Sequence, residues 1–216
     1  MMSAMRRHQR GFGGGRGGSF FGIITGMKQL IVFFALPLLS GCLSPASMPE
    51  VSQWSLEYGG AARTTKDAKF GVGRVSQVIV RTPYGTESIP VLRADGSIAF
   101  DPYNEFAALP SALVKGVVFD AMEGSGLFEN VLNASSAATS SVSVEVMVLR
   151  LALDCRQEGS RRAEAKVLVR LLKSGNNEIV GLAKGEGAED AADGNYGKAF
   201  SRALSMALST ALGQFR

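Results

Sequence analysis

The sequence predicts a single α/β domain in which a mainly antiparallel or mixed sheet of about six to eight strands carries two main helices. Segments of alternating apolar and polar residues recur between residues 54 and 184, a pattern typical of strands. Two other segments, residues 109–123 and 193–215, place apolar residues at helical spacing. The folded body is therefore expected over residues 54–216.

The first strands of this body follow one another closely. Residues 54–58 (WSLEY) alternate and predict a strand, and residues 70–81 (FGVGRVSQVIVR) are apolar on parts of both faces, as in an interior strand. Residues 89–93 and 97–100 predict a hairpin, because an Asp-Gly pair between them favours a type I′ turn. Pro90 predicts an edge position for the first hairpin strand.

A helix is expected to follow the hairpin. It begins at about Leu109, because Pro110 is tolerated in the first turn of a helix, and it ends at the glycines of residues 124–126. Its apolar side chains form one stripe, which consists of Leu113, Val114, Val117, Val118 and Ala121.

Three antiparallel strands and a closing helix complete the expected fold. In residues 142–153 the apolar alternation shifts by one residue near Val148, which predicts a β-bulge. Residues 163–171 alternate without interruption, and residues 178–184 form the last strand. Asp193 is the expected N-cap of the final helix, whose apolar face packs on the sheet or, as the alternative, binds a partner.

A leader over residues 1–41 precedes this body. It contains a positive segment, an apolar run over residues 30–39 and small residues before a cysteine, the three parts of a secretory signal. Either Met27 is the true start, or the longer segment is removed with the signal. The run is too short to cross a bilayer, which requires about 20 helical residues. Leu39-Ser40-Gly41-Cys42 resembles a bacterial lipobox, which implies cleavage before Cys42 and its acylation. The alternative is a free or disulfide-bonded cysteine after an ordinary signal.

The leader changes how the charge, histidine and cysteine counts are interpreted. It contains five of the 23 basic residues and none of the 19 acidic ones, so the rest of the chain carries a net charge of −1 and no nucleic-acid partner is expected. The single histidine, His8, is also in the leader, so the body lacks histidine for catalysis or zinc binding. We expect no enzyme and no cofactor except the covalent lipid on Cys42. Residues 42–53 become the lipidated N-terminus and a tether, and Cys155 stays a lone buried thiol.

Three local features in residues 73–128 support a family resemblance. They are Pro83-Tyr84 after a strand, a hairpin strand that ends at Arg93, and Phe106 ahead of Ala107-Ala108-Leu109-Pro110. Together they resemble the ABC-type transport auxiliary lipoproteins, the lipoprotein partners of MCE-type lipid transporters such as the Pqi system. The resemblance extends over most of residues 51–216. Family members often carry tryptophan at the position of Phe106, and the acid usual in their helix-start motif is absent here.

This resemblance implies a non-enzymatic accessory role at the membrane. The chain would dock to the MCE-domain protein of a transporter that moves phospholipids between the inner and outer membranes, with the ATPase and permease on other chains. Leu43, rather than aspartate, after the cysteine favours the periplasmic face of the outer membrane. Direct phospholipid binding and homo-oligomerisation stay open. Tyr84, Tyr103 and Phe106 are the candidate partner or lipid contacts, with ordinary turn and core packing as the alternative.

Two other function classes stay open. An envelope assembly lipoprotein, such as a secretion-channel pilot or an outer-membrane biogenesis factor, would have the same anchor and a similar small body. A carboxylate-dependent hydrolase would require paired acids in a cleft, whereas the acids near the hairpin are spread through turns. Those acids are Glu87, Asp95, Asp101 and Glu105. Neighbouring genes for an MCE transporter or for a secretin would separate the first two classes.

Overall fold

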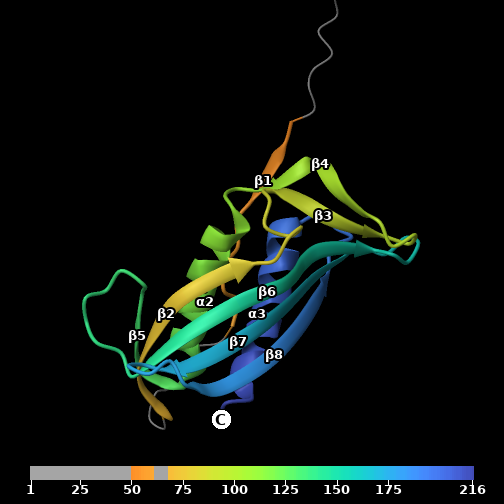
Figure 1. The fold of residues 1–216 in the computed structure, drawn as a ribbon. Helices are drawn as coiled ribbons and strands as arrows, with labels where there is room; N and C mark the ends of the chain where they lie inside the picture. The colour runs from red at the N-terminus through yellow and green to blue at the C-terminus, as the bar shows by residue number, and fades with distance from the viewer. Residues whose placement is uncertain (1–49, 61–67) are drawn as a thin grey trace, which may run out of the picture. The chain divides into compact units, whose positions relative to one another are not determined.

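The computed structural model describes residues 50–60 and 68–216, which form one mixed sheet and two helices (Figure 1). The strands are β1 (Ser52–Trp54), β2 (Phe70–Val80), β3 (Ser88–Arg93), β4 (Ile98–Phe106), β5 (Phe128–Leu132), β6 (Val142–Cys155), β7 (Arg162–Lys173) and β8 (Ile179–Asp190). The helices are α2 (Pro110–Ser125) and α3 (Tyr196–Gly213). The predicted fold class, an α/β domain with a mixed sheet and two helices, is confirmed.

The strand β6 organises the sheet. On one edge it pairs antiparallel with β7, which pairs antiparallel with β8. Its other edge is divided: β2 pairs in parallel with residues 142–148, and β3 pairs in parallel with residues 153–155. Outside these, β5 is parallel to β2, β4 is antiparallel to β3, and β1 is parallel to the end of β4. The register of β6 against β7 shifts between Val148 and Arg150, which confirms the predicted bulge.

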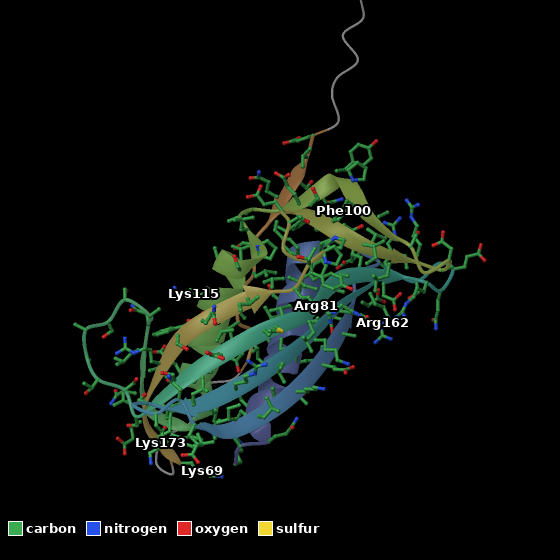
Figure 2. The ribbon with its side chains drawn as sticks, viewed as in Figure 1. Lys69, Arg81, Phe100, Lys115, Arg162 and Lys173 are labelled. Atoms are coloured by element: carbon green, nitrogen blue, oxygen red, sulfur yellow. The ribbon has the colours of Figure 1, made fainter. Side chains whose placement is uncertain are left out.

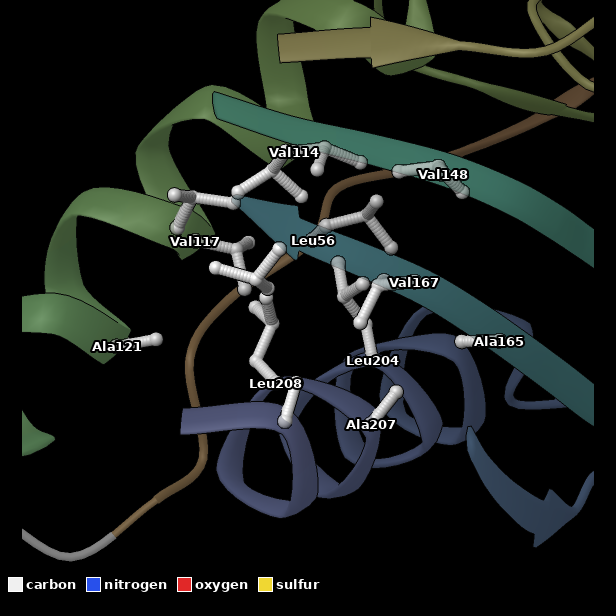
Figure 3. Packing of buried hydrophobic residues seen from close by; sticks show 14 of the residues in the cluster. Leu56, Val114, Val117, Ala121, Val148, Ala165, Val167, Leu204, Ala207 and Leu208 are labelled. Atoms are coloured by element: carbon white, nitrogen blue, oxygen red, sulfur yellow. The ribbon is translucent and has the colours of Figure 1, made fainter. Parts of the chain in front are cut away.

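Both helices pack on one face of this sheet. The helix α3 lies on β7 and β8, α2 lies on β2 and β5, and the two helices contact each other. Figure 3 shows the resulting core, in which side chains of the helices meet alternate residues of the strands, among them Val114, Val117, Val148, Val167, Leu204 and Leu208. Burial of each such side chain contributes about 1.5–3 kcal/mol. The opposite face of the sheet is covered by neither helix, and we call it the outer sheet face.

The first strand differs from the prediction. It spans Ser52–Trp54 rather than residues 54–58, so it begins inside the expected tether. The reason is its partner: Trp54 pairs with Phe106, the last residue of β4, and no strand continues beside residues 55–58. Their backbone turns instead along α3, where Glu57 N–H donates to Ser201 Oγ at 3.0 Å.

The hairpin is confirmed, but its turn type and edge position are not. Gly96 has a φ of 82° whereas Asp95 has a negative one, which fits a type I turn followed by a left-handed glycine rather than type I′. Two backbone hydrogen bonds of 3.0 Å close the turn. The Gly96 N–H donates to the Arg93 carbonyl, and the Arg93 N–H donates to the Ser97 carbonyl. The strand β3 lies between β4 and β6, and Pro90 is tolerated there because the pairing with β6 begins only at Val91.

The remaining elements differ mostly at their ends. The first helix, α2, starts with Pro110 as expected and stops at Gly126, whose φ is 68°. The N-cap of α3 is Asn195 rather than Asp193, because the Asn195 side chain accepts the Lys198 N–H at 3.1 Å. The short strand β5, which the sequence analysis missed, pairs with β2 immediately after α2.

Candidate functional site

The predicted lipidation residue, Cys42, lies outside the described residues. The first described residue is Glu50, eight positions later, and an extended chain of that length spans at most about 29 Å. An anchor at Cys42 would therefore hold β1 nearer to the membrane than a long linker would.

Large apolar side chains are exposed around the place where the chain enters the fold. Val51, Ile98, Phe100 and Tyr103 are 38–51% exposed, and we call these four residues the β4 rim. Val51 immediately precedes Ser52, whose partner in the parallel pairing of β1 with β4 is Asn104, the residue after Tyr103. Figure 2 shows Phe100 on β4, at the same end of the sheet as β1. The rim is a candidate contact surface for an apolar ligand or a membrane.

A polar network fixes the backbone beneath the rim. The carboxylate Oδ1 of Asp101 accepts the Tyr103 N–H at 2.9 Å and the Asn104 side-chain amide at 3.1 Å. The Asn104 Oδ1 in turn accepts the indole N–H of Trp54, on β1, at 3.0 Å. Pro102, between Asp101 and Tyr103, has no N–H. The rim strand is therefore held to β1 by side chains, and Pro102 and Tyr103 offer no free backbone donor.

Phe106 is not an accessible contact, which corrects the expectation for this residue. Its side chain is 1% exposed, and its ring meets that of Phe200 edge to face, with centroids 5.3 Å apart. The alternative of core packing therefore describes Phe106.

Tyr84 occupies a third environment. It is half-buried in the turn that follows β2, its N–H donates to the Arg81 carbonyl at 2.8 Å, and its side chain packs against the core. The three predicted contacts thus divide into a turn residue, Tyr84, a rim residue, Tyr103, and a core residue, Phe106. The structure does not assemble them into one site.

The outer sheet face forms a second candidate surface. Its centre is a shallow depression of about 40 Å³ to which Ile79, Met147 and Leu168 contribute apolar side chains. Paired charges lie on the same strands, and they are Glu145–Arg170 at 3.8 Å, Arg150–Glu164 at 2.8 Å and the close pair Lys166–Glu186. An apolar centre with a charged surround is the usual composition of a protein interface.

The ion pairs also control the protonation of two acids near this face. The bidentate Arg156 guanidinium, at 2.7 and 2.8 Å from the Asp154 carboxylate, holds the pKa of that acid well below its usual range. A hydrogen bond from Lys166 lowers the pKa of Glu186. Both acids therefore stay ionised at neutral pH.

The hairpin acids do not converge in the described part of the chain. Asp95 accepts the Ser97 N–H at 2.9 Å, Asp101 is held by the network described above, and Glu105 accepts from the Gln53 amide at 2.7 Å. Within residues 50–60 and 68–216 no three metal-ligating side chains gather. Over the same residues no helix is long and apolar enough to cross a membrane. Cys155 is a half-buried free thiol whose pKa is raised by burial.

Comparison with known proteins supports the fold. No family model and no curated protein sequence matches this chain. Among solved structures, a protein of the DUF330 family from Xanthomonas campestris superposes with a TM-score of 0.62 at 16% identity, over 76% of this chain and 98% of that chain. A second, uncharacterised protein superposes with a TM-score of 0.54 at 10% identity, over 76% of this chain and 100% of that chain. At such identities the likeness concerns the fold alone.

Proposed function

We propose that this chain is a membrane-anchored periplasmic accessory lipoprotein of an MCE-type ABC transport system. Acylated at Cys42, it sits at the periplasmic face of the outer membrane, docks to the MCE-domain component and supports phospholipid transport between the two membranes. The ATPase and the permease are separate chains.

One observation carries this proposal: the motif residues of the segment with the sequence resemblance each have a defined place in the fold. In that segment Pro83-Tyr84 forms the turn after β2, Arg93 ends the first hairpin strand, and Phe106 enters the core directly before Pro110 begins α2. Each motif residue thus forms part of a turn, a strand end or the core in this fold.

We assign the protein partner to the outer sheet face. Neither helix covers this face, and Ile79, Met147 and Leu168 give it an apolar centre. The surrounding ion pairs would favour one orientation of a partner over others, since charge complementarity acts mainly on specificity. Lipid contact is assigned to a different surface, the β4 rim.

The test is co-purification of the tagged, acylated chain from membranes in mild detergent. We expect an MCE-domain protein in the eluate of the wild-type chain and of a Tyr103→Ala control, and its loss from Met147→Asp with unchanged circular dichroism. A secretin subunit or an outer-membrane assembly factor in place of the MCE protein would contradict the proposal and support an envelope assembly lipoprotein.

A further inference from the structure

We propose that the β4 rim inserts into the interfacial layer of the bilayer that holds the acylated Cys42. The domain would then lie against its own membrane through Val51, Phe100 and Tyr103, rather than move freely at the end of a tether. This inference rests on the anchoring part of the proposed function, and it adds the surface that faces the lipid.

Only a short segment separates Cys42 from the rim. From Cys42 to Glu50 the chain spans at most about 29 Å, and Val51 follows immediately. Val51 is exposed and immediately precedes Ser52, which pairs with Asn104, the residue after Tyr103. The rim is therefore the part of the described surface to which the anchor is directly connected.

The exposed side chains of the rim have the chemistry of a membrane interface. Phe100 is 46% and Tyr103 is 51% exposed, which leaves two aromatic rings in contact with water on one strand. Aromatic side chains are enriched at membrane interfaces, where an apolar ring lies below the headgroups and a hydroxyl such as that of Tyr103 stays hydrated. Insertion would remove this apolar surface from water.

The rim is a poor acceptor for a partner strand. Pro102 has no N–H, and the N–H of Tyr103 is bonded to the Asp101 carboxylate at 2.9 Å. A strand that paired with this edge would lack the donors that such pairing requires. A lipid surface requires none.

The charges near the rim define which kind of membrane contact is expected. Glu50, Asp101 and Glu105 lie on or beside β1 and β4, and Asp95 and Arg93 lie at the hairpin turn. Acids outnumber bases here, so attraction to anionic headgroups cannot drive the contact. We therefore expect rim insertion to depend on apolar and aromatic burial, and not to strengthen as the anionic lipid fraction rises.

The structure offers a matched control at another exposed apolar position. Leu182, on β8, is 58% exposed, comparable with the rim residues. Through Arg170 on β7, Leu182 is in register with Glu145, near the start of β6. The hairpin that carries the rim is joined to the other end of β6, because β3 pairs with β6 from Leu153 onward. Eight residues of strand separate these two rows, about 27 Å. Figure 1 places β4 and the start of β8 at opposite ends of the sheet.

The experiment is fluorescence quenching in vesicles. The acylated chain is extracted from membranes and reconstituted into vesicles of phosphatidylethanolamine with a minor fraction of phosphatidylglycerol, with or without brominated acyl chains. Trp54 is the single tryptophan, so the added emission of Phe100→Trp or Leu182→Trp is measured against the wild-type chain. We expect brominated lipid to quench and blue-shift the emission added by Phe100→Trp, and to leave that of Leu182→Trp unchanged.

Several results would overturn the inference. They are equal quenching of both variants, quenching of neither variant in a chain that floats with the vesicles, or a shift of Phe100→Trp emission only when a second protein is added. If the chain floats with the vesicles but brominated lipid does not quench the Phe100→Trp emission, the rim contact is disproved and the proposed function is unaffected. A chain that does not float and whose Cys42 thiol is unmodified removes the anchor, and with it both proposals.

Discussion

Replacing Gly185 with alanine tests whether the backbone of α3 lies directly on β8. An added Cβ at Gly185 would overlap the carbonyl oxygen of Ala207 and would lie 2.8 Å from its carbonyl carbon and 2.9 Å from the Ala211 nitrogen. All three atoms belong to the backbone of α3, so the overlap cannot be relieved by rotating a side chain. Because non-bonded heavy atoms pack at about 3.5–4.0 Å, α3 would have to move by more than about 1 Å.

Such a displacement disturbs a fully buried interface. Overpacking a core costs typically about 1–3 kcal/mol, so we expect Gly185→Ala to lose about 2–3 kcal/mol of unfolding free energy. For a domain of this size each kcal/mol changes Tm by about 2–4 °C, which predicts a Tm lower by roughly 4–12 °C. Thermal unfolding of the purified chain, followed by circular dichroism, measures this.

Gly116→Ala is the matched control. Gly116 lies in α2, and an added Cβ there would meet nothing within 4 Å. Since alanine is favoured over glycine in a helix by about 1 kcal/mol, this variant should melt at the wild-type temperature or a few degrees higher. A Gly185→Ala chain as stable as Gly116→Ala would refute the close approach of α3 to β8.

Two further perturbations test the core and the ion pairs. Phe106→Ala should lower the free energy of unfolding in urea by about 3–5 kcal/mol, because a buried ring is removed. Tyr103→Ala should change it by less than about 0.5 kcal/mol, and equal losses in the two variants would contradict the burial of Phe106. Asp154 has a lowered pKa in the folded chain, so its contribution is fully present above the ordinary carboxylate pKa of about 4 and is lost progressively as pH falls from there through the still lower folded-state pKa. Asp154→Asn should therefore unfold at lower urea than wild type near about pH 7, by up to about 1 kcal/mol, and the difference should shrink steadily as pH falls below about 4; a difference that stays constant down to the lowest pH at which the chain is folded would contradict this assignment.

Local patterns were sufficient to predict much of the sheet. The even alternation of residues 163–171 defined β7, and the one-residue phase change at Val148 located the bulge, because both depend only on neighbours along the chain. The parallel pairing of β2 and β3 along one edge of β6 could not be predicted in this way. It depends on contacts between residues far apart in sequence, as the shortened first strand also does.

The candidate contacts show the same limit. Tyr103 and Phe106 are aromatic residues three positions apart, and nothing in their spacing tells which of them is buried. The difference arises within β4, where Pro102 has no N–H and Asp101 bonds the Tyr103 backbone, so that Tyr103 faces solvent while Phe106 meets Phe200. A proline inside the expected loop was the available signal. It could not be interpreted without knowing that β4 continues through it.

The functional account depends on what happens at Cys42, and mass spectrometry of the N-terminal peptide of the membrane-extracted chain tests it most directly. The account predicts a mature chain that begins at Cys42, with a diacylglycerol on the sulfur and an acyl chain on the new amino group. An unmodified Cys42 thiol, or a mature chain that begins at any other residue, would contradict it.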